Sequence, residues 1–168
     1  MSRLDSAIRR LEAQRDCLDA AARLIAEVPG PILELGLGNG RTYDHLRGLF
    51  PERDIFVFDR RVAAHPDCIP NDEHLFLGDM TETLPLAAAR LGRSAALAHA
   101  DLGSGRPEPD ARLAGQVGPL LAHLVRPEGV VLSDQPFSGG AWVELPQPKG
   151  VAPNRYFLYR PASGRSSA

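Results

Sequence analysis

The sequence predicts an α/β fold: a mostly parallel sheet with antiparallel C-terminal strands, and an N-terminal helix packed on the domain. Short apolar runs alternate with helical patterns from residue 32 to residue 133. The runs are apolar on both faces, which is typical of parallel strands covered by helices on two sides. A length of 168 residues suits one domain, so we expect a single domain over 1–168 with a disordered tail at 161–168.

The first predicted element is an amphipathic helix that starts at Leu4 and ends before the turn at residues 28–31. Its apolar or small residues recur at spacings of three and four, which places them along one face. This stripe consists of Leu4, Ile8, Leu11, Leu18, Ala22 and Ile25. Because the stripe is apolar, we expect the helix to pack on the body of the domain.

Five strands and three helices are expected to follow in alternation. The strands are predicted at residues 32–35, 55–58, 75–77, 95–100 and 130–133. The helices between them are predicted at about 42–50, 82–91 and 110–125.

The chain after residue 133 departs from this alternation. Two more strands are predicted at 141–145 and 156–159, and only residues 135–140 separate the first of them from the fifth strand. A parallel crossover needs roughly a dozen residues, so we expect the sixth strand to run antiparallel. The missing helix leaves part of one sheet face to be covered by the N-terminal helix or by a second subunit. On this ground we expect a homo-oligomer.

The composition excludes several classes of function. A net charge of −2 without a long basic run is unlike a nucleic-acid binder. No apolar stretch approaches the ~20 residues of a membrane span, and the charged N-terminus does not resemble a secretory signal. Cys17 and Cys68 lie far apart without metal-ligand spacing, so neither a disulfide nor a zinc site is expected. We therefore expect a cytoplasmic protein that acts on a small molecule, with neither nucleic acid nor membrane as partner.

A glycine-rich segment, Glu34-Leu35-Gly36-Leu37-Gly38-Asn39-Gly40, falls where the first predicted strand turns into a helix. Glycines at such a turn let the backbone approach a ligand and adopt conformations closed to other residues. Asp59 ends the second strand about 20 residues later, the spacing at which a carboxylate in this kind of fold can accept hydrogen bonds from both ribose hydroxyls. Loop and carboxylate together predict a nucleotide-like ligand.

On these motifs the chain resembles the class I, Rossmann-like S-adenosylmethionine-dependent methyltransferases of the small single-domain bacterial type, from about Ile32 to Ser133. The resemblance implies a three-layer Rossmann-like sandwich, S-adenosyl-L-methionine as cofactor and S-adenosyl-L-homocysteine as product. It also implies that the loop binds the methionine end of the cofactor. The loop residues concerned are Glu34, Gly36, Gly38, Asn39 and Gly40.

The resemblance implies further cofactor contacts after the second, third and fourth strands. Asp59 corresponds to the ribose-binding acid, and Arg60 stands beside the adenine, where the family more often has an apolar side chain. Asp79 corresponds to the acid that meets the adenine amino group, and Met80 to a wall of the adenine pocket. Asp101 belongs to a motif near the reactive methyl group.

A nicotinamide-dependent dehydrogenase is the nearest rival of the same architecture. Its fingerprint is GxGxxG, whereas the third glycine here comes one position early, and Asp79 has no counterpart in that motif. A P-loop is excluded because neither Gly-Lys-Ser nor Gly-Lys-Thr occurs.

Asp101 and Asp134 are the candidate catalytic residues, because they follow the fourth and fifth strands, whose carboxyl ends meet in such sheets. Either could act as a base if the acceptor must lose a proton. Asp134-Gln135 faintly resembles the Asp-Asn pair of metal-dependent O-methyltransferases, but no third acid is identifiable, so Mg²⁺ is only the lesser alternative. His99 faces the same side of its strand as Asp101, although a core histidine is the favoured interpretation.

Several aromatic and histidine side chains lie near the predicted site without a specific signal. Helix-surface roles are favoured for Tyr43 and His45. Ordinary packing explains the late aromatic residues Phe137, Trp142 and Tyr156 at least as well as a role at the acceptor.

The predicted function is transfer of a methyl group from S-adenosylmethionine to an oxygen or nitrogen of a small-molecule acceptor by in-line displacement. The sulfonium makes the methyl group electrophilic, so alignment of the acceptor is the enzyme's main task. The alternative is a non-catalytic module that binds S-adenosylmethionine or S-adenosylhomocysteine, alone or as a subunit of a larger enzyme.

Overall fold

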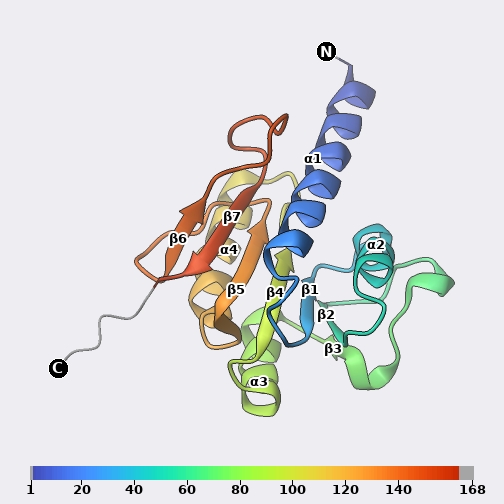
Figure 1. Cartoon of the computed structure of the whole chain (residues 1–168). Helices are drawn as coiled ribbons and strands as arrows, with labels where there is room; N and C mark the ends of the chain where they lie inside the picture. Colours follow the sequence, from blue (N-terminus) through green and yellow to red (C-terminus); the bar gives the residue numbers. More distant parts are fainter. Residues whose placement is uncertain (1, 163–168) are drawn as a thin grey trace.

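The computed structural model describes residues 2–162 and is built on one seven-stranded sheet with the order β3-β2-β1-β4-β5-β7-β6 (Figure 1). The strands are β1 (Ile32–Leu35), β2 (Ile55–Asp59), β3 (Leu75–Leu77), β4 (Ala95–Ala100), β5 (Val125–Ser133), β6 (Trp142–Leu145) and β7 (Phe157–Pro161). Strands β1 to β5 pair in parallel, and β7 is antiparallel to β5 and β6. This confirms the predicted mostly parallel sheet with antiparallel C-terminal strands. The tail predicted to be disordered from residue 161 is wrong at its start, because Pro161 ends β7 and Ala162 donates to the Ala141 carbonyl at 2.8 Å. Residues 163–168 lie outside the described residues.

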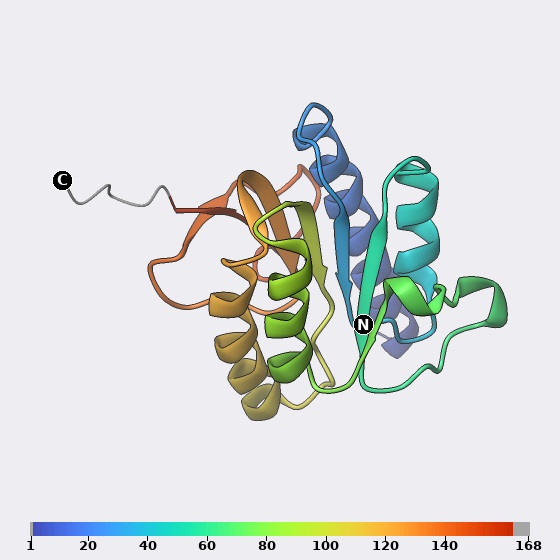
Figure 2. The same cartoon turned by 90° about the horizontal axis from the view of Figure 1, so that it is seen from below.

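Helices cover both faces of the sheet, which confirms the three-layer sandwich. The helices are α1 (Arg3–Leu24), α2 (Arg41–Leu49), α3 (Met80–Leu91) and α4 (Pro107–Leu121), with short 3-10 turns at Pro66–Cys68 and Asp72–His74. Figure 2 shows α1 and α2, in blue and cyan, on one side of the sheet and α3 and α4, in green and gold, on the other. No helix among residues 2–162 combines the length and the apolar character needed to cross a bilayer.

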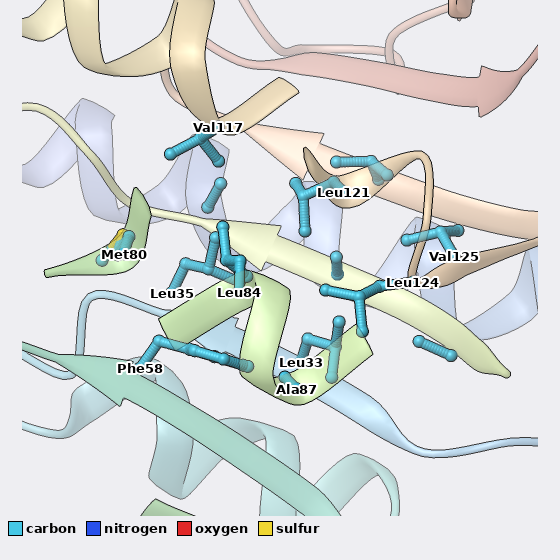
Figure 3. Close-up of a cluster of buried hydrophobic side chains, with 14 of the residues drawn as sticks. Leu33, Leu35, Phe58, Met80, Leu84, Ala87, Val117, Leu121, Leu124 and Val125 are labelled. Carbon is cyan, nitrogen blue, oxygen red and sulfur yellow. The ribbon is translucent and has the colours of Figure 1, made fainter. Parts of the chain in front are cut away.

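Each helical layer buries its own hydrophobic cluster against the sheet. On one face, β1 residues Leu33 and Leu35 meet Leu84 of α3 and Leu121 of α4 (Figure 3). All four side chains have no exposed surface. At about 25 cal/mol per Å² of buried apolar area, such clusters supply most of the free energy that holds the layers together.

Helix α1 packs on the opposite face, but with a different stripe from the predicted one. Leu18 and Ile25 are buried as expected, whereas Leu4 is 68% exposed and Ile8 is 45% exposed. The first turns of α1 have no part of the sheet beneath them (Figure 1), so their apolar residues remain in contact with solvent. The residues of α1 buried against the domain are Ala13, Gln14, Cys17, Leu18 and Ala21.

The boundaries of α3 and α4 differ from the prediction for local reasons. Helix α3 begins two residues early, at Met80, because the Asp79 carboxylate caps it by accepting from the Thr81 amide. Helix α4 begins at Pro107, since proline at the first helical position loses no hydrogen bond. It ends at Leu121 rather than 125, because Val125 already pairs with Ala95 as the start of β5.

The expectation that the sixth strand reverses the direction of the fifth is wrong. Strand β7 lies between them and is antiparallel to both, so β6 points the same way as β5. The dozen-residue rule assumes a helical crossover, whereas an extended segment of residues 134–141 can reach roughly 27 Å. Because β6 has only four residues, this length lets the chain run back along the sheet from the end of β5 to the start of β6 without a helix.

The sheet area beside β5 is covered within one chain, without a second subunit. On the α4 side, Trp142 is only 9% exposed and donates its indole N–H to the Gly118 carbonyl at 3.2 Å. Phe137, from the loop that replaces the missing helix, stacks on Tyr159 at a centroid distance of 5.4 Å. On the other side, Leu132 and Leu158 belong to the cluster that α1 covers. The uncovered sheet face, which was the reason for predicting a homo-oligomer, is therefore not found within residues 2–162.

Candidate functional site

A cavity of about 1020 Å³ opens at the carboxyl ends of β1, β2, β4 and β5, the edge at which open α/β sheets bind ligands. Six residues predicted to bind the cofactor line it: Gly36, Gly38, Asp59, Arg60, Met80 and Asp101. Its volume is at the upper end of the ~300–1,000 Å³ of pockets for single small ligands, so it has room for a ligand as large as the predicted cofactor.

The glycine loop leaves β1 in conformations that require glycine. Gly36 has a φ of 91°, and a Cβ there would come within 2.4 Å of the Asp101 carbonyl oxygen. The loop after β1 can therefore lie against the loop after β4 only with glycine at this position. Gly38 also has a positive φ, 51°, and nothing lies within 4 Å of the position of a Cβ there, because this glycine faces the open cavity.

The Asp59 carboxylate at the end of β2 is tied to the glycine loop. Its Oδ2 accepts from the amides of Leu37 at 2.9 Å and Gly38 at 3.2 Å, and its Oδ1 accepts from the Arg61 amide at 3.2 Å. The two elements that sequence reasoning linked by spacing are thus linked by hydrogen bonds. The carboxylate lines the cavity and retains lone pairs for a ligand.

Two residues predicted to bind the cofactor follow β3, and one of them lines the cavity. Met80 lines it, whereas Asp79 caps α3 and pairs with Arg60 at 3.0 Å. The Thr81 hydroxyl and amide, followed by Arg60, hold the pKa of Asp79 below its usual value. The contact of Asp79 with the adenine amino group stays a prediction.

A buried polar network runs beneath the cavity from β1 to α1. Glu34 is fully buried, accepts from the Thr42 hydroxyl, and lies 2.6 Å from Nδ1 of the equally buried His99. His99 Nε2 lies 2.9 Å from the Tyr156 hydroxyl. Gln14 of α1 donates to that hydroxyl at 2.8 Å and to Asp101 Oδ2 at 3.2 Å. Glu34 therefore supports the site from below and does not line the cavity.

The charges of this network set the protonation of its members. Burial lowers the pKa of His99, but the Glu34 carboxylate outweighs it, so the pKa is raised overall. His99 bridges the Glu34 carboxylate through Nδ1 and the Tyr156 hydroxyl through Nε2. Burial, with Asp101 and Asp134 nearby, raises the pKa of Tyr156 well above its ordinary value, so its hydroxyl stays protonated. His99 is thus a hydrogen-bonded core histidine, which was the favoured interpretation.

We expect Tyr156→Phe to lower the free energy of unfolding by about 1–3 kcal/mol, because it leaves the buried Nε2 of His99 without its hydrogen-bond partner and removes one of the two acceptors of Gln14. Urea denaturation measures the change. Tyr43→Phe is the matched control, since no described residue hydrogen-bonds the Tyr43 hydroxyl. Equal stabilities for the Tyr156 variant and the parent protein would show that the network contributes nothing.

The two predicted catalytic carboxylates occupy one wall of the cavity but face different partners. Asp134 accepts the amides of Leu102 at 2.9 Å and Gly103 at 2.8 Å, and so fixes the loop after β4. Burial, and next the Asp101 charge, raises the pKa of Asp134 despite these bonds. Among the described residues only Gln14 bonds the Asp101 carboxylate, through Oδ2, and Asp101 lines the cavity.

The donor set here does not suit Mg²⁺, the lesser alternative of the sequence analysis. Both oxygens of Asp134 already accept backbone N–H groups, and the Gln135 amide nitrogen lies 3.3 Å from one of them. Mg²⁺ requires free oxygen ligands in near-octahedral geometry. Within residues 2–162, no cluster of three or more histidine, cysteine or acidic side chains is arranged to hold a metal ion.

The remaining predicted residues lie away from the cavity. Asn39 accepts from the Arg41 amide at 3.3 Å on the surface, and Gly40 is the N-cap of α2. His45 pairs with Asp19 at 2.8 Å, which joins α2 to α1. The helix-surface role favoured for His45 agrees with this pairing, whereas the one favoured for Tyr43 is wrong, because Tyr43 is a buried member of the cluster under α1.

Sequence reasoning missed the contribution of α1 to the site. Gln14 follows Leu11 by three residues and precedes Leu18 by four, so it falls within the apolar stripe, and a polar residue there signals a buried hydrogen bond. No local pattern marks the other cavity residues, which distant segments contribute. They include Arg10, Arg106, Asp110, Asn154 and Arg155.

Known proteins resemble this chain in sequence and in fold. The sequence model of a family described as S-adenosyl-L-methionine methyltransferase matches residues 1–161. The crystal structure of an S-adenosyl-L-methionine methyl transferase from Silicibacter pomeroyi DSS-3 shares 44% sequence identity. It superposes with a TM-score of 0.91 over 96% of this chain and 99% of that one. A search among functionally curated proteins found no match.

More distant structures share the fold. DesVI of Streptomyces venezuelae has a TM-score of 0.52 at 19% identity, over 80% of this chain and 57% of that one. MycE, a methyltransferase of the mycinamycin biosynthetic pathway solved with Mg, S-adenosylhomocysteine and mycinamycin VI, has a TM-score of 0.54 at 16% identity. It is matched over 90% of this chain and 48% of its own.

Proposed function

The chain belongs to the S-adenosyl-L-methionine methyltransferase family, and we propose that it methylates an oxygen or nitrogen atom of a small-molecule acceptor held in the cavity. Its cofactor is S-adenosyl-L-methionine, whose sulfonium supplies an electrophilic methyl group. The observation that carries the proposal is that the glycine loop, Asp59 and Asp101 all line one cavity of about 1020 Å³. MycE, which shares the fold, was solved with the small molecule mycinamycin VI bound.

We propose that the wall formed by β1, β2 and β3 holds the cofactor. The backbone at Gly36 and Gly38 lies close to the methionine end of the cofactor, since no side chain intervenes, and the Asp59 carboxylate accepts hydrogen bonds from the ribose hydroxyls. Met80 presents an apolar surface for the adenine. Arg60, fixed by its ion pair with Asp79, lies beside it and can stack on an aromatic ring. Glu34 supports this wall from beneath.

We propose Asp101 as the acceptor-facing base and Asp134 as a positioning residue. Gln14 fixes Asp101 through one oxygen, which leaves the other to accept a proton from an acceptor hydroxyl or ammonium group. The bonds of Asp134 to the amides of Leu102 and Gly103 hold the loop on which the acceptor rests. Alignment of the acceptor lone pair, fixed by these contacts, supplies most of the acceleration.

We also propose that the chain forms one domain, acts in the cytoplasm and associates with a second copy. Support for association comes from Leu4 and Ile8, which remain exposed at the start of α1. Light scattering of the purified protein tests it: a dimer that Leu4→Glu with Ile8→Glu dissociates supports the proposal, and a monomeric parent protein contradicts it.

Ligand-dependent thermal denaturation tests the cofactor assignment. We expect S-adenosylmethionine or S-adenosylhomocysteine at about 100 times its Kd to stabilise the native state by ~2.7 kcal/mol, a rise of roughly 5–10 °C in Tm. NAD at the same concentration should produce no rise. Stabilisation by NAD alone would contradict the proposal, and a cofactor shift without methyl transfer to any acceptor would favour the non-catalytic module.

A further inference from the structure

The cavity lining contains four arginines and four aspartates, but three of the arginines form no ion pair among residues 2–162. These three are Arg10 from α1, Arg106 at the start of α4 and Arg155 before β7. Ion pairs occur at other places in residues 2–162, but none includes any of these three guanidinium groups. The fourth lining arginine, Arg60, is paired with Asp79.

The carboxylates of the same cavity are engaged elsewhere. Asp59 and Asp134 accept backbone amides of the loops after β1 and β4. Asp110 is only 5% exposed and accepts from the Ser104 hydroxyl and from the amides of Ser104 and Arg106. Of the four carboxylates, Asp101 alone accepts no backbone amide from the described residues; its Oδ2 accepts from Gln14. In a chain with a net charge of −2, unpaired arginines gathered in one cavity indicate an anionic ligand.

The buried network brings two of these arginines to one end of the cavity. Arg10 precedes Gln14 by four residues and so lies on the same face of α1, one turn away. Arg155 directly precedes Tyr156, whose hydroxyl accepts from Gln14 at 2.8 Å. Figure 1 shows the segment between β6 and β7 rising beside α1, which brings these two parts of the chain together. Gln14 also bonds Asp101, so the segments that carry both arginines meet beside Asp101.

We propose that Arg10 and Arg155 bind an oxyanion of the methyl acceptor, so that the acceptor is a small molecule with a carboxylate or phosphate group. Planar guanidinium groups suit both oxyanions, because they can donate two parallel hydrogen bonds to each. Anchoring the acceptor at this end directs its remaining part towards Asp101 and the methyl group. This inference rests on the proposed function, because it requires the cofactor to occupy the other end.

The test uses the full chain loaded with S-adenosylhomocysteine, after binding of that ligand has been measured by calorimetry. Inorganic phosphate and benzoate are then added at constant ionic strength, with neutral benzamide as the uncharged control, and Tm is recorded. We expect both anions to raise Tm and benzamide to leave it unchanged. Arg10→Ala with Arg155→Ala should weaken the apparent anion affinity at least about tenfold. Arg9→Ala, which removes a neighbouring charge of α1 outside the cavity lining, should leave it unchanged.

Each other outcome contradicts the inference. No response of the loaded parent protein to either anion, or an equal response in the double variant, means that the arginines hold no oxyanion. If the double variant instead binds S-adenosylhomocysteine at least tenfold more weakly but 5′-methylthioadenosine normally, the arginines serve the carboxylate of the cofactor itself. Failure of the parent protein to bind S-adenosylhomocysteine overturns the proposed function, and this result is recorded before any anion is added.

Discussion

Glu34→Ala is expected to lower the free energy of unfolding by about 3–5 kcal/mol, because it removes one partner of a fully buried pair. His99 would keep its buried ring without the carboxylate that raises its pKa, and the Thr42 hydroxyl would lose its acceptor. A loss of this size is a large fraction of the 5–15 kcal/mol typical of a domain. Urea denaturation monitored by circular dichroism measures it.

Glu34→Gln keeps the shape of the side chain and one acceptor oxygen, and it replaces Glu34→Ala in this experiment if the alanine variant does not fold. Its destabilisation should depend on pH. The pKa of His99 is raised in the native state, so the stability due to its protonation is fully present below its ordinary pKa of about 6.5. It is lost as the pH rises through the native pKa. The stability difference between parent protein and variant should therefore be larger near pH 6 than near pH 9, and a gap that widens towards high pH would contradict this assignment.

Asp59→Ala is expected to weaken the binding of S-adenosylhomocysteine at least about a hundredfold. A hydrogen bond to a charged group is worth about 1.5–3 kcal/mol, and the proposed ribose contact contains two of them. The substitution also releases the amides of Leu37 and Gly38, so the glycine loop loses its fixed position. Isothermal titration calorimetry gives the Kd directly.

Two variants separate the ligand contact of Asp59 from its support of the loop. Asp59→Asn retains one acceptor oxygen for the loop amides and should weaken binding less than alanine does. Asp67→Ala removes a carboxylate whose side chain is 87% exposed, and should leave the Kd unchanged. Unaltered affinity in Asp59→Ala would refute the ribose assignment.

The sheet, the helical layers and the family could all be predicted from the sequence, because each depends on local patterns. Apolar runs on both faces mark buried strands, and the positions of Gly36 and Asp59 relative to the first two strands are properties of a short segment. The structure adds that Asp59 binds the glycine loop itself, which gives a physical reason for their spacing.

The sequence could not predict the long-range polar contacts or the direction of β6. Gln14, His99 and Tyr156 come from α1, β4 and the segment before β7, and only the folded chain brings them together. The direction of β6 depends on β7 inserting between β5 and β6, which a rule for neighbouring strands does not consider. For the same reason Arg10 and Arg155 carry no local signal, although both line the cavity.

A crystal structure of the protein with S-adenosylhomocysteine tests the central claim, that one cavity holds the cofactor against β1 to β3 and leaves its other end to the acceptor. We expect the ribose hydroxyls within hydrogen-bond distance of Asp59, the adenine against Met80 and the sulfur atom directed towards Asp101. The space between Asp101 and the two arginines, Arg10 and Arg155, should remain open. A ligand bound outside this cavity, or with its ribose away from Asp59, would contradict the account.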